Sequence, residues 1–206
     1  MGANRNGAWG HAAHVNTADI ALVLLAAGRG ERFGGGKLAA LLAGKPIARH
    51  CADPLAAIAF RAHLAVVGPD TPPLPGYDTI LLDPPGAPQS RSLALGVAAA
   101  QARGAQAVLI ALADMPLVPT EHVLTMIARF DGDRLASSTS DSTASRTALP
   151  PALFGARHFS ALCALTGDRG AGALLRDAPA LPLPGHAALD IDRIEDLARA
   201  TRLLAR

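Results

Sequence analysis

A continuous apolar segment near the start of the chain runs directly into a loop of glycines and basic residues. The segment Ile20–Ala26 reads IALVLLA, and the loop Gly28–Lys37 holds five glycines, two arginines and a lysine. An apolar run without alternation is typical of a strand covered on both faces, as in parallel α/β sheets. Glycine lets the backbone approach a ligand closely, and loop N–H groups with arginine and lysine bind phosphate oxygens. The stretch therefore predicts a loop that holds a nucleoside triphosphate at the end of a buried strand.

Strand-like and helix-like segments alternate along the rest of the chain. Further strands are expected at His63–Val67, Thr79–Leu82, Ala107–Leu112, Leu135–Ser138 and Ala188–Ile191. Helices are expected at 46–59, 90–103 and 120–130, within 151–165, and at 171–177 and 194–205. This alternation predicts a Rossmann-like α/β fold with a mostly parallel central sheet, helices on both faces and right-handed crossovers. We expect a single domain over residues 19–206, preceded by a flexible leader over residues 1–18.

Charge and composition argue against several classes of protein. The formal net charge is only +2, which gives no reason to expect binding to nucleic acid or to a membrane surface. No apolar run approaches the ~20 residues of a membrane-spanning helix. Cys51 and Cys163 are isolated and lack metal-binding spacing, so we expect reduced thiols in a cytoplasmic protein.

Aspartates follow three of the predicted strands. Asp83, Asp114 and Asp192 each stand just beyond the carboxyl end of a strand, which is where ligands bind in open α/β sheets. Mg²⁺ is usually held by one or two carboxylates and by the phosphates of the substrate. We therefore expect Asp114 and Asp192 to bind Mg²⁺, with a turn or helix-capping role as the alternative for each. Asp190 competes with Asp192, because a shift of two residues keeps the same side of a strand.

Spacing separates the glycine-rich loop from two better-known phosphate-binding motifs. A Walker A loop needs glycine six residues before its lysine and Ser or Thr after it, but Glu31 and Leu38 occupy these positions around Lys37. The dinucleotide pattern GxGxxG fails at its third glycine, where Phe33 stands. A mobile surface loop is the alternative interpretation, and the basic residues placed directly after a strand argue against it.

Five motifs, in order along the chain, are similar to those of the MobA-like nucleotidyltransferases. They are LAAGRGERFGGGK at 25–37, QSRSLALG at 89–96, LADMP at 112–116, PALF and LTGDRGA at 151–154 and 165–171, and DIDRIEDL at 190–197. The chain resembles in particular the molybdenum cofactor cytidylyltransferase branch, because the related guanylyltransferases tend to carry glycine where Ala27 stands. The segment before Pro150 lacks a glycine that the family often has, and this difference lies where the acceptor substrate would approach.

The resemblance implies a Mg²⁺-dependent transfer of CMP from CTP to molybdopterin or molybdenum cofactor, with release of pyrophosphate. It also implies a transient complex with a molybdenum hydroxylase that receives the product. The expected catalytic residues are Lys37, Arg29 and Asp114. The expected nucleotide- and cofactor-binding residues are Leu25, Ala26, Ala27, Gly28, Arg29, Gly30, Arg32, Lys37, Asp83, Ser92 and Arg169.

The chemistry of nucleotidyl transfer agrees with a basic loop facing carboxylates. A phosphate monoester is already largely dianionic near neutral pH, so the acceptor needs positioning and charge neutralisation more than a general base. Lys37, Arg29 and Arg32 are expected to hold the β- and γ-phosphates, with support from the amides of Gly28 and Gly30.

The base and the acceptor are less closely specified by the sequence. Asp83 and Ser92 are candidates to read the base, and Arg169 is a candidate to bind an anionic group of the acceptor. A plain helix position for Ser92 and a surface salt bridge for Arg169 fit equally well. The alternative functions are a GTP-dependent guanylyltransferase or a sugar-phosphate nucleotidyltransferase of the same fold, and a non-catalytic nucleotide- or cofactor-binding chaperone. A pure binder has no need for both Asp114 and Asp192.

Overall fold

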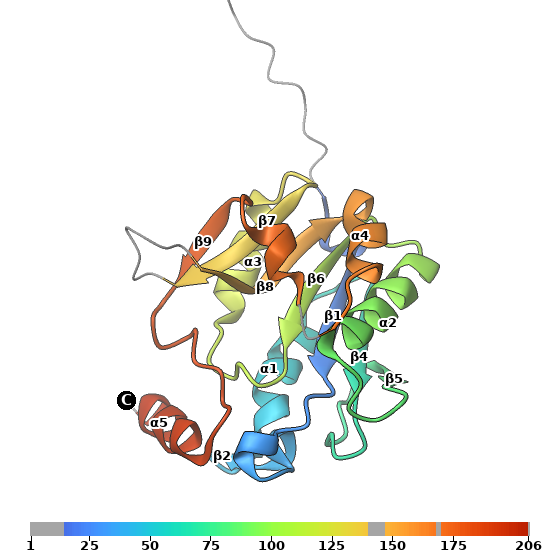
Figure 1. The fold of residues 1–206 in the computed structure, drawn as a ribbon. Helices are drawn as coiled ribbons and strands as arrows, with labels where there is room; N and C mark the ends of the chain where they lie inside the picture. Colours follow the sequence, from blue (N-terminus) through green and yellow to red (C-terminus); the bar gives the residue numbers. More distant parts are fainter. Residues whose placement is uncertain (1–14, 140–146, 168–169, 206) are drawn as a thin grey trace, which may run out of the picture.

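Seven strands form one central sheet in the computed structural model, which describes residues 15–139, 147–167 and 170–205. Their order is β5-β4-β1-β6-β8-β7-β9 (Figure 1). The strands are β1 (Ile20–Ala26), β4 (Ala62–Val67), β5 (Asp78–Leu81), β6 (Ala107–Leu112), β7 (Arg134–Thr139), β8 (Ala148–Gly155) and β9 (Ala180–Leu183). All neighbours run parallel, except that β8 is antiparallel to both β6 and β7. The predicted α/β fold with a mostly parallel sheet is confirmed.

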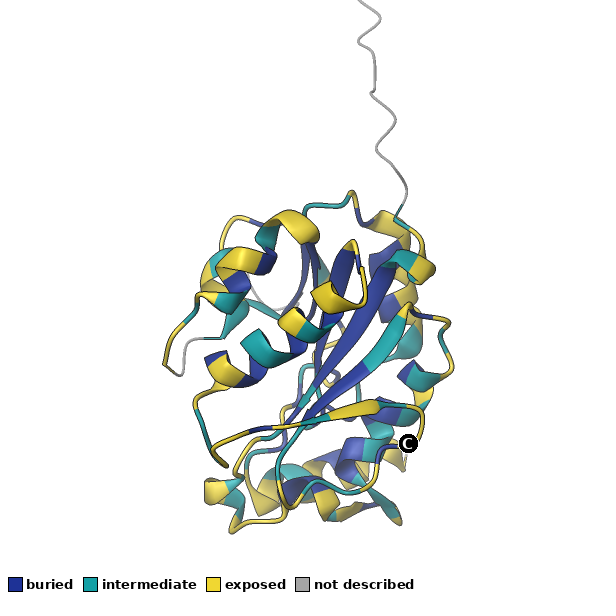
Figure 2. Cartoon of the chain, turned by 90° about the vertical axis from the view of Figure 1, so that its right-hand side faces the viewer, coloured by how far each residue is buried: buried dark blue, intermediate teal, exposed yellow. Residues whose placement is uncertain are grey.

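Helices cover both faces of this sheet. The helices are α1 (Ile47–Ala56), α2 (Gln89–Ala102), α3 (Thr120–Arg129), α4 (Phe159–Cys163) and α5 (Ile194–Leu204). Buried side chains of α1 and α3 belong to the core on one face, and those of α2 and α4 to the core on the other. Figure 2 shows the buried strands with helices whose outer sides are exposed. Helix α5 lies away from the sheet, beside a short hairpin of β2 (Leu41–Leu42) and β3 (Lys45–Pro46).

Single 3-10 turns connect several of these elements. They are η1 (Thr17–Asp19), η2 (Glu31–Phe33), η3 (Lys37–Ala39), η4 (Ala156–His158) and η5 (Ala171–Leu175). Two of them, η2 and η3, lie within or directly after the glycine-rich loop, so this loop has regular structure on both sides of its three consecutive glycines.

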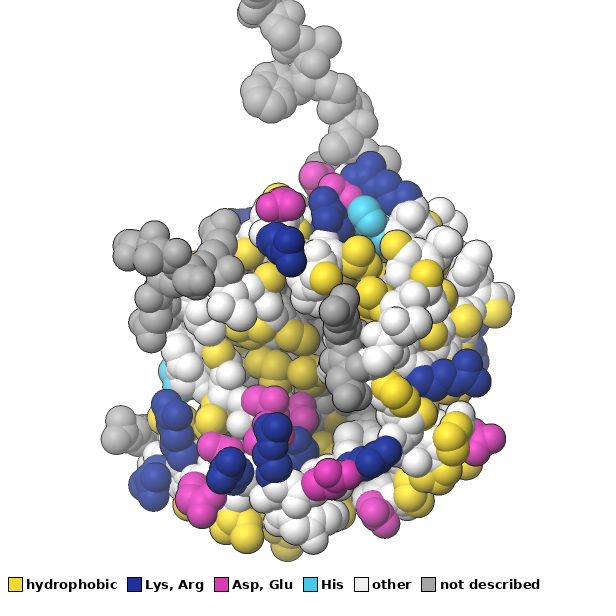
Figure 3. Space-filling view, viewed as in Figure 1, with side chains coloured by type: hydrophobic (Ala, Val, Ile, Leu, Met, Phe, Trp, Pro, Cys, Tyr) yellow, Lys and Arg dark blue, Asp and Glu magenta, His cyan; other side chains and the backbone are white. Residues whose placement is uncertain are grey.

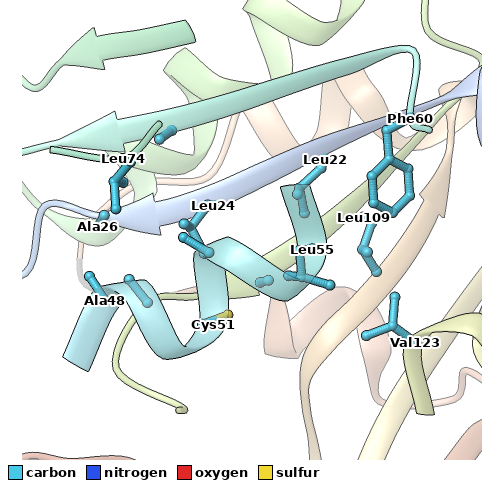
Figure 4. Close-up of a cluster of buried hydrophobic side chains, with 14 of the residues drawn as sticks. Leu22, Leu24, Ala26, Ala48, Cys51, Leu55, Phe60, Leu74, Leu109 and Val123 are labelled. Atoms are coloured by element: carbon cyan, nitrogen blue, oxygen red, sulfur yellow. The ribbon is translucent and has the colours of Figure 1, made fainter. Parts of the chain in front are cut away.

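Strand β1 is the centre of the core because its successive side chains point to opposite faces. Leu22 and Leu24 face α1 and pack near Leu55 (Figure 4). Val23 points the other way and joins the cluster that contains Val97 of α2. All five side chains are at most 5% exposed, which agrees with the unbroken apolar run in the sequence.

Gly96 allows α2 to lie very close to the sheet. A Cβ atom built at Gly96 would overlap Cγ1 of Val23 on β1 and would lie 3.3 Å from Cγ2 of Val66 on β4. The first turn of α2, which faces the carboxyl edge of the sheet, is therefore held at a fixed position relative to β1.

The C-terminal third differs from the prediction in several places, one of which is strand β9, which was not expected. Residues Ala188–Ile191 were predicted to form a strand but form none, because this segment lies beyond the carboxyl edge of the sheet, where it has no strand beside it. The helix expected within 151–165 is present and spans Phe159–Cys163, whereas residues 151–155, for which no strand was expected, belong to β8. Pairing with β6 and β7 makes residues 151–155 a strand, and Pro150 and Pro151 disfavour a helix interior here.

No helix in the described ranges is long and apolar enough to cross a membrane. The domain boundary expected at residue 18 stays a prediction, because residues 1–14 lie outside the described part of the chain.

Candidate active site

A cleft of about 550 Å³ lies beyond the carboxyl ends of β1 and β6. These strands are neighbours, although the chain passes through β4 and β5 between them. Such a reversal of strand order opens a crevice at the edge of an α/β sheet. The glycine-rich loop, the start of α2 and the segment before α5 form its walls. Figure 3 shows acidic and basic side chains gathered side by side on the lower part of this face.

Three carboxylates and one buried ammonium group meet in the cleft. Nζ of Lys37 lies 2.7 Å from Oδ2 of Asp114 and 3.1 Å from Oδ1 of Asp192. The same nitrogen lies 4.0 Å from Oδ1 of Asp190. The Lys37 side chain is only 5% exposed, whereas those of Asp190 and Asp192 are 45% exposed. The ammonium group is therefore enclosed, and the carboxylates of Asp190 and Asp192 stay open to the cleft.

The segment before α5 brings Asp190 and Asp192 to the end of β6. The N–H of Ile191 donates a hydrogen bond of 3.0 Å to the backbone carbonyl of Asp114. The Ile191 side chain is fully buried, and the aspartates on either side of it line the cleft. The N–H of Asp192 in turn donates to Oδ2 of Asp196 at 3.1 Å. One backbone contact and one side-chain cap thus place both carboxylates beside Asp114.

The glycine-rich loop folds back so that Lys37 reaches these carboxylates. Gly30 has a φ of +59°, and a Cβ atom built there would lie 2.9 Å from Cβ of Lys37. Only glycine fits this backbone conformation and this approach without strain. A Cβ atom at Gly28 would meet nothing within 4 Å, so the loop backbone at Gly28 faces open space in the cleft.

The charges in this group shift the pKa of two of its members. Burial alone would lower the pKa of Lys37. The charge and hydrogen bond of Asp114 outweigh this effect, together with the contacts to Asp192 and Asp190, so the pKa of Lys37 is raised. The Lys37 side chain is therefore a cation at neutral pH. Burial and the charge of Asp114 raise the pKa of Asp190 to about 7, although the charge of Lys37 opposes this shift. The group carries more negative than positive charge.

Two arginines of the loop make separate contacts around the cleft. Arg29 donates to the backbone carbonyl of Gly86 and forms an exposed ion pair with Glu31 at 3.0 Å. Arg29 thus links the glycine-rich loop to the segment before α2. Arg32 approaches Oδ2 of Asp192 at 3.4 Å and is 73% exposed. Both guanidinium groups border the space in which a phosphate chain would lie.

Comparison with known proteins agrees with this geometry. The family described as the MobA-like NTP transferase domain matches residues 22–183. The chain belongs to this family. The match ends before Asp190 and Asp192, so their membership of the site rests on the structure alone. No curated protein sequence matches the chain.

Solved structures of similar fold cover nearly the whole chain. Rv0371c from Mycobacterium tuberculosis H37Rv is 22% identical, with a TM-score of 0.76 over 91% of this chain and 100% of that one. A nucleotidyl transferase from Methanothermobacter thermautotroptrophicus is 22% identical, with a TM-score of 0.73 over 91% of this chain and 98% of that one. The 4-diphosphocytidyl-2C-methyl-D-erythritol synthase of Anaerococcus prevotii is 16% identical, with a TM-score of 0.66 over 93% and 100%. These structures share the fold of the MobA-like chain.

The structure brings together most of the site residues predicted from the sequence. Those that line the cleft are Leu25, Ala27, Gly28, Arg29, Gly30, Arg32, Lys37, Ser92, Asp114 and Asp192, together with the competing candidate Asp190. Ala26 is buried behind the cleft, and its carbonyl accepts a hydrogen bond from Thr71. Asp83 is exposed and is not part of the cleft lining. Arg169 lies outside the described residues.

Other lining residues were not singled out in advance. They are Glu31, Gly86, Ala87, Pro88, Gln89 and Leu112. Gly86 follows two prolines, and Gln89 opens the second family motif. The sequence around these two positions could therefore have pointed to them as part of the site. Leu112 opens the third family motif, but it also reads as an ordinary strand residue and was therefore not assigned to the site.

The carboxylates suit a divalent cation in a MobA-like NTP transferase. One oxygen from each of Asp114, Asp190 and Asp192 lies within 4.8 Å of the others. Oδ1 of Asp114 is buried and has no hydrogen-bond partner among the described residues. A buried carboxylate oxygen without a partner is costly unless a ligand satisfies it, and hard oxygen donors are what Mg²⁺ and Mn²⁺ bind. The donor set therefore fits such an ion.

Proposed function

We propose that this nucleotidyltransferase moves CMP from CTP to the phosphate of a molybdopterin-type acceptor and releases pyrophosphate, with Mg²⁺ as its cofactor. One observation carries the proposal. Lys37, Asp114 and Asp192 are in direct contact at the switch point of the sheet, and Asp190 lies next to them. A cation that links phosphates to these carboxylates meets the main requirement of nucleotidyl transfer, which is charge neutralisation.

The reaction forms and breaks one phosphorus–oxygen bond. An oxygen of the acceptor phosphate attacks the α-phosphorus of CTP, and the bond from the α-phosphorus to the bridging oxygen breaks. Pyrophosphate leaves with the bonding electron pair. A divalent cation held by Asp114 with Asp190 or Asp192 would neutralise charge on the phosphate oxygens. The acceptor phosphate is largely dianionic near neutral pH, so no residue of the chain has to remove a proton.

Lys37 connects the carboxylates with the triphosphate. An ammonium group has three N–H donors, and two of them serve Asp114 and Asp192. The third stays available for a phosphate oxygen. Arg29, Arg32 and the amides at Gly28 and Gly30 complete the set of donors for the leaving pyrophosphate. Lys37 thus acts as a fixed point charge between metal ligands and phosphates.

The preference for cytosine rests on the loop and on the small residue at its start. Ala27 lines the cleft where related guanylyltransferases tend to carry glycine, and its methyl group narrows the space available to a base. The synthase from A. prevotii, whose name includes a diphosphocytidyl product, has the same fold. A structure of Rv0371c is titled as a complex with manganese, which agrees with a divalent cation in this fold.

Pyrophosphate release tests the proposal. The protein is incubated with Mg²⁺ and either CTP or GTP, and with molybdopterin or with sugar phosphates as acceptor. We expect release with CTP and molybdopterin. Release with GTP alone would overturn the choice of base, and release with sugar phosphates alone would overturn the acceptor. If no combination releases pyrophosphate, the enzyme proposal fails and a nucleotide-binding chaperone takes its place. A transient complex with a molybdenum hydroxylase is the proposed route for the product.

A further inference from the structure

The carboxyl ends of β1 and β4 are joined through a side chain instead of a backbone bond. The two strands pair in register up to Ala26 opposite Val67. The N–H of Gly68, the first residue after β4, donates at 3.0 Å to Oγ1 of Thr71, and this hydroxyl donates at 2.6 Å to the carbonyl of Ala26. The hydroxyl therefore lies between a backbone donor and a backbone acceptor at the point where the parallel ladder would continue.

The other side of β1 is held by an ordinary backbone bond. The N–H of Ala113, just beyond β6, donates at 3.0 Å to the carbonyl of Leu25. The last two carbonyls of β1, those of Leu25 and Ala26, thus accept hydrogen bonds from opposite neighbours. The chain enters the glycine-rich loop from a strand end that is fixed on one side by the backbone and on the other by Thr71.

The loop that carries Thr71 is itself well supported. Four of the seven residues 69–75 are prolines, and each proline fixes its own φ. Leu74 is 5% exposed, belongs to the same core cluster as Ala26 and lies at the carboxyl end of β1 (Figure 4). The hydroxyl of Tyr77 donates at 2.8 Å to a backbone carbonyl of α1. The Thr71 hydroxyl is therefore presented to β1 from a rigid segment.

This arrangement determines where one wall of the cleft lies. A Cβ atom built at Gly68 would lie 3.6 Å from Cα of Ala27, so the loop after β4 packs directly on the start of the glycine-rich loop. A recess of about 230 Å³ opens here, and Ala27, Gly28, Gly68 and Thr71 are among the residues that line it. Ala27 and Gly28 also line the catalytic cleft. The backbone that separates the recess from the cleft is thus attached to the Thr71 hydroxyl through Ala26.

We propose that Thr71 is a positioning residue for the nucleotide, and that its hydroxyl fixes Ala27 and Gly28 in the wall of the cleft. The inference rests on the proposed function, which places the base beside Ala27 and the phosphates beside Gly28. Without the hydroxyl, the N–H of Gly68 and the carbonyl of Ala26 either stay unpaired or close to a direct bond of about 2.9 Å. Both outcomes move the backbone that begins at Ala27.

Three variants isolate the hydroxyl. Thr71→Val keeps the branched shape and removes the hydrogen bonds, and Thr71→Ser keeps the hydroxyl. Thr125→Val is the matched control, because Oγ1 of Thr125 also donates to a backbone carbonyl, at 2.7 Å, on an exposed part of α3 outside the cleft. Binding of CTP and GTP is measured by calorimetry with Mg²⁺ present. Mn²⁺ binding without nucleotide is measured by electron paramagnetic resonance.

The affinity for CTP should change while the metal site does not. We expect Thr71→Val to weaken CTP binding about fivefold, since it disrupts two hydrogen bonds that hold the wall. The ratio of CTP to GTP affinity should fall, because Ala27 no longer limits the space for the base. Mn²⁺ affinity should stay within about twofold, since the carboxylates lie on other segments. Thr71→Ser should restore CTP binding, and Thr125→Val should change none of these quantities.

Two results would overturn the role of Thr71. One is CTP affinity in Thr71→Val equal to that of Thr125→Val. The other is an equal loss of CTP and Mn²⁺ affinity that Thr71→Ser does not restore, which would indicate general destabilisation.

Hydrogen exchange separates this inference from the proposed function. Exchange over residues 26–30 is measured by mass spectrometry on the protein without nucleotide, and we expect it to be about fivefold faster in Thr71→Val than in Thr125→Val. Equal exchange in the two variants would contradict the positioning role. If the natural chain binds neither CTP nor GTP, the proposed function fails, and the exchange rates still decide whether Thr71 holds the loop. A preference for GTP overturns only the choice of base, and the loss in Thr71→Val is then expected for GTP.

Discussion

Asp196 holds the segment that carries Asp192, and its removal should weaken metal binding from a distance. Oδ2 of Asp196 accepts hydrogen bonds from the N–H groups of Asp192 at 3.1 Å and of Arg193 at 2.8 Å. Backbone N–H groups at the start of a helix have no partner within the helix, so these two depend on the Asp196 side chain. Asp196→Ala removes both acceptors while leaving every proposed metal ligand in place.

The expected size of this effect follows from helix capping. Replacing a side chain that accepts bonds at a helix N-terminus costs about 1 kcal/mol, and loss of a negative charge there costs about 0.3–1 kcal/mol more. Glu195 lies in the same first turn and is exposed, so Glu195→Ala removes only a charge. The difference between the two variants isolates about 1 kcal/mol, which is about fivefold in affinity if it all falls on Asp192.

Manganese binding without nucleotide measures this difference. Free Mn²⁺ is followed by electron paramagnetic resonance during titration of each variant, and folding is checked by circular dichroism. We expect the dissociation constant of Asp196→Ala to exceed that of Glu195→Ala about fivefold. Asp196→Asn keeps one acceptor oxygen and should recover part of the loss. Equal constants for the two alanine variants would refute the idea that Asp196 positions Asp192.

Three further predictions test other parts of the structure. Gly96→Ala should destabilise the protein by about 1–3 kcal/mol in denaturant unfolding, because the added methyl group overlaps Val23 and overpacks the core; unchanged stability would contradict the close approach of α2. Lys37→Ala should tighten Mn²⁺ binding while weakening CTP binding, since it removes a cation that contacts the same carboxylates; weaker binding of both would show that Lys37 mainly holds the fold. Burial lowers the pKa of His122, so the folded state resists its protonation. The stability that the neutral side chain contributes is present above the unfolded pKa of about 6.5 and is lost as the pH falls from there through the lower pKa of the folded state. Unfolding at pH 7.5 and 5.5 should show a larger loss for the natural chain than for His122→Gln.

The centre of the fold could be predicted because its signals are local. The unbroken apolar run Ile20–Ala26 corresponds to β1, and Ala107–Leu112 corresponds to β6, with the bounds expected. Each strand is covered on both faces, so burial alone explains why its residues form an unbroken apolar run. The glycine-rich loop follows β1 directly and Asp114 follows β6. Because the carboxyl ends of neighbouring parallel strands lie at the same edge of the sheet, both were expected in one cleft.

The remaining features depend on contacts between distant segments. The buried Lys37 contacts Asp192, which lies 155 residues further along the chain, and a backbone hydrogen bond from Ile191 to Asp114 holds the segment that carries Asp192. Likewise, β8 contains Pro150 and Pro151, and its pairing with the two neighbouring strands makes it a strand. Asp83 was expected in the site because it follows a strand, but β5 lies at the edge of the sheet, two strands away from β1. Asp83 itself does not line the cleft, whereas Gly86, three residues further along, does.

Metal binding by the carboxylate group tests the central claim most directly. Asp114→Asn keeps the shape of the side chain and removes the charge beside the unpartnered oxygen, and Asp177→Asn makes the same change at an exposed position outside the cleft. Mn²⁺ binding is measured by paramagnetic resonance, and pyrophosphate release from CTP is measured on the same samples over a range of metal concentrations. We expect the Mn²⁺ affinity of Asp114→Asn to fall at least about tenfold, because a single charged ligand contributes about 1.4 kcal/mol or more to binding. This variant should also lose metal-dependent release of pyrophosphate. Asp177→Asn should retain both the Mn²⁺ affinity and the release of pyrophosphate. Unchanged metal affinity and release in Asp114→Asn would contradict the assignment of this group as the metal site of a nucleotidyltransferase.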